Sequence, residues 1–167
     1  MRRLAAVALT VVLIAVAVGL AACAPDPRIT QVQSTVRQYN TQLAKAYAGQ
    51  DMNALAPVAT KKQAETEYYL MASLGEGKLR MFSKLDSLQF GSIVFPGDTA
   101  ALARTSEVWD YRQISTETSA VVRSEKGVTY HLEYRLVLKD GRWLVDSVKS
   151  TDPTRTAAPS GAASTTP

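Results

Sequence analysis

The sequence predicts an α+β domain in which N-terminal helices pack on a curved antiparallel sheet. Two observations support this fold class. Between Ile29 and Gly75, apolar residues recur every three or four positions, which is typical of amphipathic helices. From Leu85 onward the repeat changes to two, which is typical of half-buried strands. Helices that precede a run of strands in this way indicate an α+β architecture.

Two helices are expected at the start of the domain. The apolar stripe that begins at Ile29 predicts a helix over residues 29–48, and Gly49 supplies its C-terminal stop signal. A much shorter helix should follow over residues 52–56, because Pro57 lacks the N–H group that a longer helix would need.

A third helix is expected to begin just after Thr60. The spacing of Thr60 and Gln63 matches a capping box, in which the two residues satisfy the free N–H groups of the first turn. The glycines of Gly75-Glu76-Gly77 should end the helix. Its predicted apolar face consists of Ala64, Tyr68, Met71 and Gly75, with Leu70 and Leu74 beside it.

Five strands are predicted behind the helices, with turn signals between them. They cover residues 85–95, 101–111, 118–124, 128–139 and 142–148. Asp140-Gly141 is a typical hairpin turn, and Glu125-Lys126-Gly127 is interpreted as the turn between the third and fourth strands. The face of the second strand expected to be more buried carries Ala101, Ala103, Thr105, Glu107, Trp109 and Tyr111.

The first residues of the chain have the features of an export signal. Met1-Arg2-Arg3 precedes an uncharged, mostly apolar run from Leu4 to Ala22. Its end, Leu20-Ala21-Ala22-Cys23, resembles the lipobox of bacterial lipoproteins. The resemblance implies cleavage between Ala22 and Cys23 and attachment of a diacylglyceryl group to Cys23, the only cysteine of the chain.

An uncleaved membrane helix and plain secretion remain as alternatives, since the apolar run is nearly as long as the roughly 20 residues that span a bilayer. Pro25 and Pro27 favour cleavage, because they break a helix just past the cysteine. Residues 1–22 are then a signal peptide and residues 23–28 a lipidated tether. The expected location is the extracytoplasmic face of the cell membrane, or the periplasmic side of the outer membrane in a Gram-negative cell.

Composition limits the functions open to the mature chain. Loss of Arg2 and Arg3 lowers the formal charge from +4 to about +2. No dense Lys/Arg patch with interleaved aromatic residues is present, so nucleic-acid binding is not expected. Residues 151–167 contain no aromatic or large aliphatic residue, and a disordered tail is predicted there. The folded domain is assigned to residues 29–150.

The order of the elements, together with the stretches 107–111 (Glu-Val-Trp-Asp-Tyr) and 140–146 (Asp-Gly-Arg-Trp-Leu-Val-Asp), resembles the NTF2-like superfamily. A Trp-x-Tyr strand followed by Tyr-x-Leu-x-Tyr-x-Leu is similar to its IMS-type and Mce-associated branches. The resemblance implies a cystatin-like α+β cone with a mouth. It does not decide the function, because the superfamily includes enzymes, transport factors and binding modules.

The cone implies one candidate pocket. Its residues are Glu107, Trp109, Tyr111, Tyr130, Tyr134 and Trp143. Glu107 would act as a base in such a pocket, but it is expected instead to bond a neighbouring strand's hydroxyl or to pair with Arg112 or Arg135. The aromatic residues are expected to be ordinary core, with an apolar ligand pocket as the alternative.

The sequence predicts no catalytic residue, metal site or cofactor. Phosphate-binding, catalytic-serine and zinc motifs are missing, and His131, the only histidine, is expected on a polar, solvated face. The leading hypothesis is therefore a non-catalytic binding or assembly module that contacts another envelope protein. A carrier of a small apolar ligand is the second hypothesis, and a cavity enzyme that uses Glu107 with a tyrosine is the third.

Overall fold

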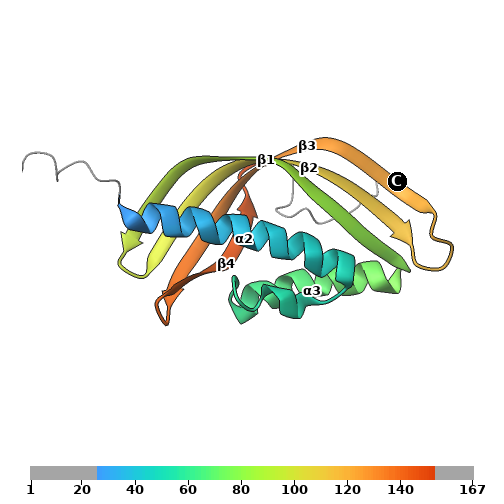
Figure 1. The fold of residues 1–167 in the computed structure, drawn as a ribbon, viewed down its shortest axis with the longest axis horizontal. Coiled ribbons are helices and arrows are strands. Elements are labelled where there is room, and N and C mark those ends of the chain that lie inside the picture. Colours follow the sequence, from blue (N-terminus) through green and yellow to red (C-terminus); the bar gives the residue numbers. More distant parts are fainter. Residues whose placement is uncertain (1–25, 153–167) are drawn as a thin grey trace, which may run out of the picture.

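The computed structural model describes residues 26–152 as two layers, with the helices against the concave face of a curved four-stranded sheet (Figure 1). The strands are antiparallel and neighbours in the sequence are neighbours in the sheet. The elements are α2 (Pro27–Gly49), η2 (Met52–Leu55), α3 (Lys61–Glu76), β1 (Leu79–Gly97), β2 (Ala100–Ser115), β3 (Val121–Lys139) and β4 (Arg142–Ser150). This arrangement confirms the predicted fold class.

The ends of α2 differ slightly from the prediction. The helix begins at Pro27 because the Asp26 side chain caps it, accepting a hydrogen bond from the Arg28 backbone N–H at 2.9 Å. Its C-cap residue, which has a left-handed backbone conformation, is Gln50, one residue after the predicted stop at Gly49. At α3 the predicted cap Thr60 is confirmed, since its hydroxyl accepts from the Gln63 N–H at 3.3 Å. The Gln63 side chain does not complete the predicted capping box, because it donates to Tyr39 and Glu67 instead.

The buried face of α3 was predicted only in part, since Leu74 lies in the core and Ala64, Leu70 and Met71 pack against it. Gln63, Glu67 and Leu74 are its buried residues, whereas Tyr68 of the predicted face is 51% exposed. Two of the three buried residues, Gln63 and Glu67, are polar, so apolar periodicity does not indicate them.

The number of strands was also predicted wrongly, because the expected third and fourth strands are the single strand β3. Trp109 pairs with Val128 and Tyr111 pairs with Glu125, so one residue more lies on β3 than on β2 between these pairs. Gly127 has φ +64° at this point. The predicted turn is therefore a β-bulge, which uses glycine for the same left-handed conformation.

Substitution of Gly127 by alanine should destabilise the domain by about 1 kcal/mol, because a Cβ atom disfavours this conformation. Gly49→Ala is the matched control. Its Cβ would meet no atom within 4 Å and its φ is not positive, so no loss is expected. Urea unfolding of both variants measures the difference. Equal stability of the two variants would contradict this account of the bulge.

The core lies between α2 and the sheet. The predicted face of β2 is confirmed, since its side chains from position 101 to 109 are buried in alternation. The Asp140-Gly141 turn is confirmed as well, with both residues at positive φ. Within residues 26–152, no helix is long and apolar enough to cross a membrane. Ala22, Cys23 and the predicted signal peptide lie outside the described residues, as do residues 153–167 of the predicted tail.

Candidate functional site

Glu107 occupies the centre of the core and is fully buried. Its Oε1 accepts hydrogen bonds from Asn40 Nδ2 at 3.1 Å, the Thr105 hydroxyl at 2.9 Å and the Tyr134 hydroxyl at 2.7 Å. Its Oε2 accepts from the Trp109 indole N–H at 2.8 Å. Four donors therefore surround the carboxylate, three at Oε1 and one at Oε2.

This arrangement agrees with the structural role expected for Glu107. The carboxylate bonds a hydroxyl on the neighbouring strand β3, as predicted, and its partners include neither Arg112 nor Arg135. The side chain of a general base must reach a substrate proton. Glu107 instead connects α2, β2 and β3 inside the domain.

Glu67 forms a second buried polar cluster between α3 and α2, which the sequence did not indicate. Its Oε1 accepts from the Tyr39 hydroxyl at 3.0 Å and from Gln63 Nε2 at 2.9 Å, and its Oε2 accepts from the Tyr47 hydroxyl at 2.8 Å. Burial raises the pKa of Glu67 above its usual 4.5, although the hydrogen bonds from Tyr47, Tyr39 and Gln63 oppose the rise.

The two clusters meet through a pair of tyrosines. The rings of Tyr39 and Tyr134 contact each other edge to face, with 6.1 Å between their centroids. Burial, followed by the nearby carboxylates, holds the pKa of both tyrosines well above 10. Both hydroxyls therefore stay protonated at neutral pH, which lets them donate to Glu67 and Glu107.

The raised pKa of Glu67 gives a pH-dependent prediction. The pKa of Glu67 is higher in the folded state than in the unfolded state, where it is close to 4.5. The stability that this group contributes is therefore fully present below about pH 4.5 and is lost as pH rises through the raised pKa. Glutamine does not titrate, so the stability difference between Glu67→Gln and the native protein should shift in favour of the variant as pH rises from about 4 to about 7. Thermal unfolding at both pH values measures the change, and Glu65→Gln, on the exposed side of α3, is the control. An unchanged stability difference between Glu67→Gln and the native protein at the two pH values would contradict the burial argument.

The other candidate pocket residues divide between the core and the surface. Trp109, Tyr134 and Trp143 are buried, while Tyr111 and Tyr130 are partly buried and pack against the core. Trp143 also borders a hollow beside α2. Tyr111 borders a different cavity, at the surface.

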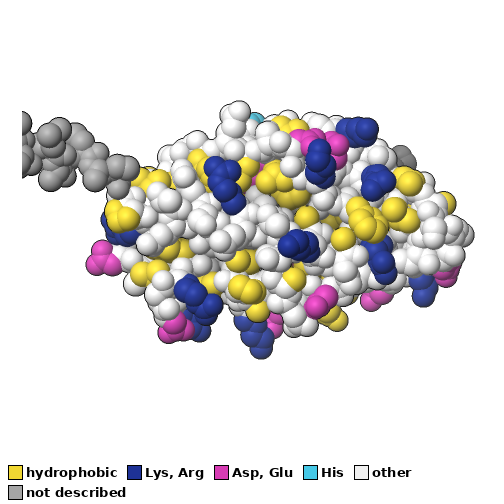
Figure 2. Space-filling model, viewed as in Figure 1, with side chains coloured by type: hydrophobic (Ala, Val, Ile, Leu, Met, Phe, Trp, Pro, Cys, Tyr) yellow, Lys and Arg dark blue, Asp and Glu magenta, His cyan; other side chains and the backbone are white. Residues whose placement is uncertain are grey.

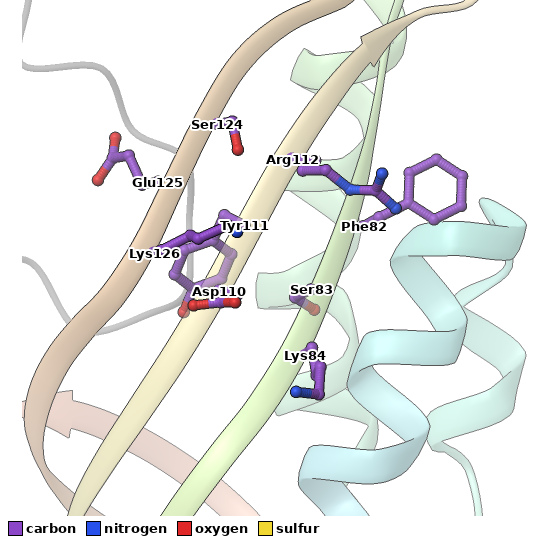
Figure 3. Close-up of a pocket in the computed structure, with 9 residues that line it drawn as sticks. All are labelled: Phe82, Ser83, Lys84, Asp110, Tyr111, Arg112, Ser124, Glu125 and Lys126. Carbon is purple, nitrogen blue, oxygen red and sulfur yellow. The ribbon is translucent and has the colours of Figure 1, made fainter.

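This surface cavity, of about 420 Å³, lies where β1, β2 and β3 extend away from the N-terminal end of α2 (Figure 3). In Figure 3, Arg112 reaches from β2 toward Phe82, and Lys126, Asp110 and Tyr111 gather between β2 and β3. The lining residues are Phe82, Ser83, Lys84, Asp110, Tyr111, Arg112, Ser124, Glu125 and Lys126. The sequence did not indicate this cavity, which lies at the bulge of β3.

Basic residues do not gather into a binding patch on the face in Figure 2, where Lys and Arg are scattered among acidic and neutral side chains. His131 is exposed on β3, as expected from the strand alternation. Among residues 26–152, no group of three or more His, Cys, Asp or Glu side chains is arranged to hold a metal ion.

No protein-family model and no curated protein matches this chain. Among solved structures, it is similar to the intermembrane space region of chloroplast protein ARC6, with TM-score 0.60 and 16% identity over 76% of this chain and 97% of that one. A ketosteroid isomerase-like protein from Erwinia carotovora atroseptica has TM-score 0.49 and 13% identity over 74% and 96%. An Ntf2-like protein involved in plasmid conjugation has TM-score 0.49 and 14% identity over 75% and 49%. At these identities the likeness concerns the fold alone.

Proposed function

We propose that this protein is a lipoprotein of the cell envelope, anchored through Cys23 at the extracytoplasmic face of a membrane, and that its domain binds another envelope protein without catalysis. The observation that carries the proposal is Leu20-Ala21-Ala22-Cys23 at the end of the apolar leader. The four hydrogen bonds to Glu107 support a non-catalytic role, because they commit the buried carboxylate to the structure.

The proposed anchor also orients the domain. Asp26, the cap of α2, is three residues from Cys23, and three residues reach at most about 10 Å. The N-terminal end of α2 lies beside the β1–β2 hairpin, where Arg28 approaches Asp98 at 3.9 Å and stacks on Phe95. This end of the molecule should face the lipid, and the opposite end in Figure 1 remains free for a partner.

Cys23→Ala tests the anchor. The variant should remain at the size of the precursor and lose all labelling by a fatty-acid analogue in the host, because no other cysteine exists to accept the lipid. Ala24→Ser keeps the cysteine and should be labelled like the native protein. Labelling that persists in Cys23→Ala would refute the assignment.

The carrier hypothesis has less support than the binding module. Trp109, Tyr134 and Trp143 would line an open cone, but they are buried in the core. Native mass spectrometry of the protein purified from its host should therefore show no bound apolar ligand. A stoichiometric lipid in addition to the one on Cys23 would favour the carrier.

A further inference from the structure

We propose that the cavity between β1, β2 and β3 binds a carboxylate-rich segment of the partner protein. The inference rests on the proposed function, because it identifies the chemistry of that partner. It depends on the charges around the cavity and on the way the strands position them.

The strand register sets the side chains of the cavity in rows. Phe82 pairs with Arg112 and Arg112 with Ser124, so one apolar, one cationic and one hydroxyl side chain lie side by side on three strands. The bulge places Lys126 next to this row, because Lys126 and Gly127 together lie opposite the single residue Asp110. Groups held on paired strands are already positioned for a ligand.

The carboxylates near the cavity already have partners. Asp110 Oδ1 accepts from the Gly127 N–H at 2.8 Å, and Glu125 forms an ion pair with Arg123. A third carboxylate, Asp86, pairs with Lys84 at 2.6 Å.

Three cations (Lys84, Arg112 and Lys126) and two carboxylates (Asp110 and Glu125) line the cavity, so its lining carries one net positive charge. Within residues 26–152, neither Arg112 nor Lys126 forms an ion pair. After the hydrogen bond from Lys84, the charge of Lys126 also lowers the pKa of Asp86, so Lys126 already has an anionic neighbour. Arg112 is therefore the cation of the cavity that an anionic group from outside complements.

A carboxylate side chain fits this arrangement. The guanidinium group of Arg112 can hold a carboxylate through two parallel hydrogen bonds, and Lys126 adds a positive charge elsewhere in the lining of the same cavity. Phe82 offers an apolar wall for the aliphatic part of a glutamate, and the Ser124 hydroxyl offers a further donor.

The position of the cavity favours a protein segment over the headgroups of the anchoring membrane. Phe82 and Phe95 lie on the same strand, separated by roughly 40 Å of strand contour. Phe95 contacts Arg28 near the anchored end of the domain, so the cavity lies toward the opposite end.

The test uses the full chain purified in detergent from its host membrane, with a fluorescent octaglutamate peptide as the probe. Anisotropy at low salt should show saturable binding that Arg112→Gln and Lys126→Gln each weaken by about fivefold, the usual effect of losing one well-placed charged contact. Arg135→Gln is the matched control, because it removes the same charge from an exposed site on β3. Circular dichroism should show that all the variants are folded.

Two results would overturn the proposal. One is an octaglutamate affinity that Arg112→Gln and Arg135→Gln lower equally, since that result indicates non-specific attraction to a basic protein. The other is tight, Arg112-dependent binding to phosphatidylglycerol vesicles together with little binding to octaglutamate. The peptide assay does not depend on lipid attachment. If octaglutamate does not bind but Cys23 carries lipid, the cavity proposal fails and the anchor stands. If octaglutamate binds but Cys23 carries no lipid, the anchor fails and the cavity site stands.

Discussion

Replacement of Glu107 by alanine is expected to lower the free energy of unfolding by about 3–5 kcal/mol. The substitution removes the carboxylate that accepts from four buried donors, on Asn40, Thr105, Trp109 and Tyr134. Of these, the Tyr134 hydroxyl can still donate to Asn40 Oδ1, which lies 3.1 Å away. Each buried group without a hydrogen-bond partner costs about 1–3 kcal/mol, and a partly relaxed cavity adds to the loss. Chemical denaturation in urea or guanidinium measures the change.

Glu133→Ala is the control for this experiment. Glu133 lies on the same sheet but forms a surface ion pair with Arg104 at 3.0 Å, and such pairs contribute about 0–1 kcal/mol. Glu107→Gln should fall between the two alanine variants, because its amide keeps one acceptor oxygen but presents N–H groups to a donor. A loss below about 1 kcal/mol for Glu107→Ala would contradict the central structural role of this carboxylate.

Tyr39→Ala is expected to destabilise the domain by a similar amount, about 3–5 kcal/mol, which is typical of the loss of a buried aromatic ring. The ring is 1% exposed and contacts Tyr134, and its hydroxyl donates to Glu67 and accepts from Gln63. Tyr39→Phe keeps the ring and removes only the hydroxyl, so a loss of about 1–2 kcal/mol is expected.

The control for Tyr39 lies on α3. Tyr69 is 72% exposed, and Tyr69→Ala should change stability by no more than about 0.5 kcal/mol. Thermal and urea unfolding of the three variants should give the order Tyr69→Ala, Tyr39→Phe, Tyr39→Ala from most to least stable. A Tyr39→Phe variant as unstable as Tyr39→Ala would show that the hydroxyl, and not ring packing, dominates.

The sequence was sufficient for the parts of the fold that depend on local pattern. The capping residue Thr60, the hairpin at Asp140-Gly141 and the buried face of β2 all follow from spacing and turn chemistry. The bulge at Gly127 was read as a turn, because glycine at positive φ serves both structures. The pairing with β2 on both sides of Gly127 is what shows that β3 continues in the same direction.

The polar core could be predicted only in part. Thr105, Glu107 and Trp109 are two residues apart on one strand face, so the sequence places them together. The contacts of Glu107 with Asn40 and Tyr134 depend on the packing of α2 against the sheet. On α3, Gln63, Glu67 and Leu74 do follow helical spacing, but the polar residues concealed the stripe. The cavity depends on the bulge, which the sequence did not reveal.

The two proposals place different demands on opposite ends of the molecule. The anchored end needs only a short connection from Cys23 to Asp26, whereas the cavity at Arg112 and Lys126 needs a free approach for a partner. Under the two proposals, the sheet that joins these ends would hold the binding site away from the lipid surface.

The mass of the N-terminal peptide of the protein purified from its host membrane tests the central claim most directly. The account predicts a chain that begins at Cys23 and carries the added mass of a diacylglyceryl group. A chain that still begins at Met1, or a cleaved chain with an unmodified Cys23, would contradict it.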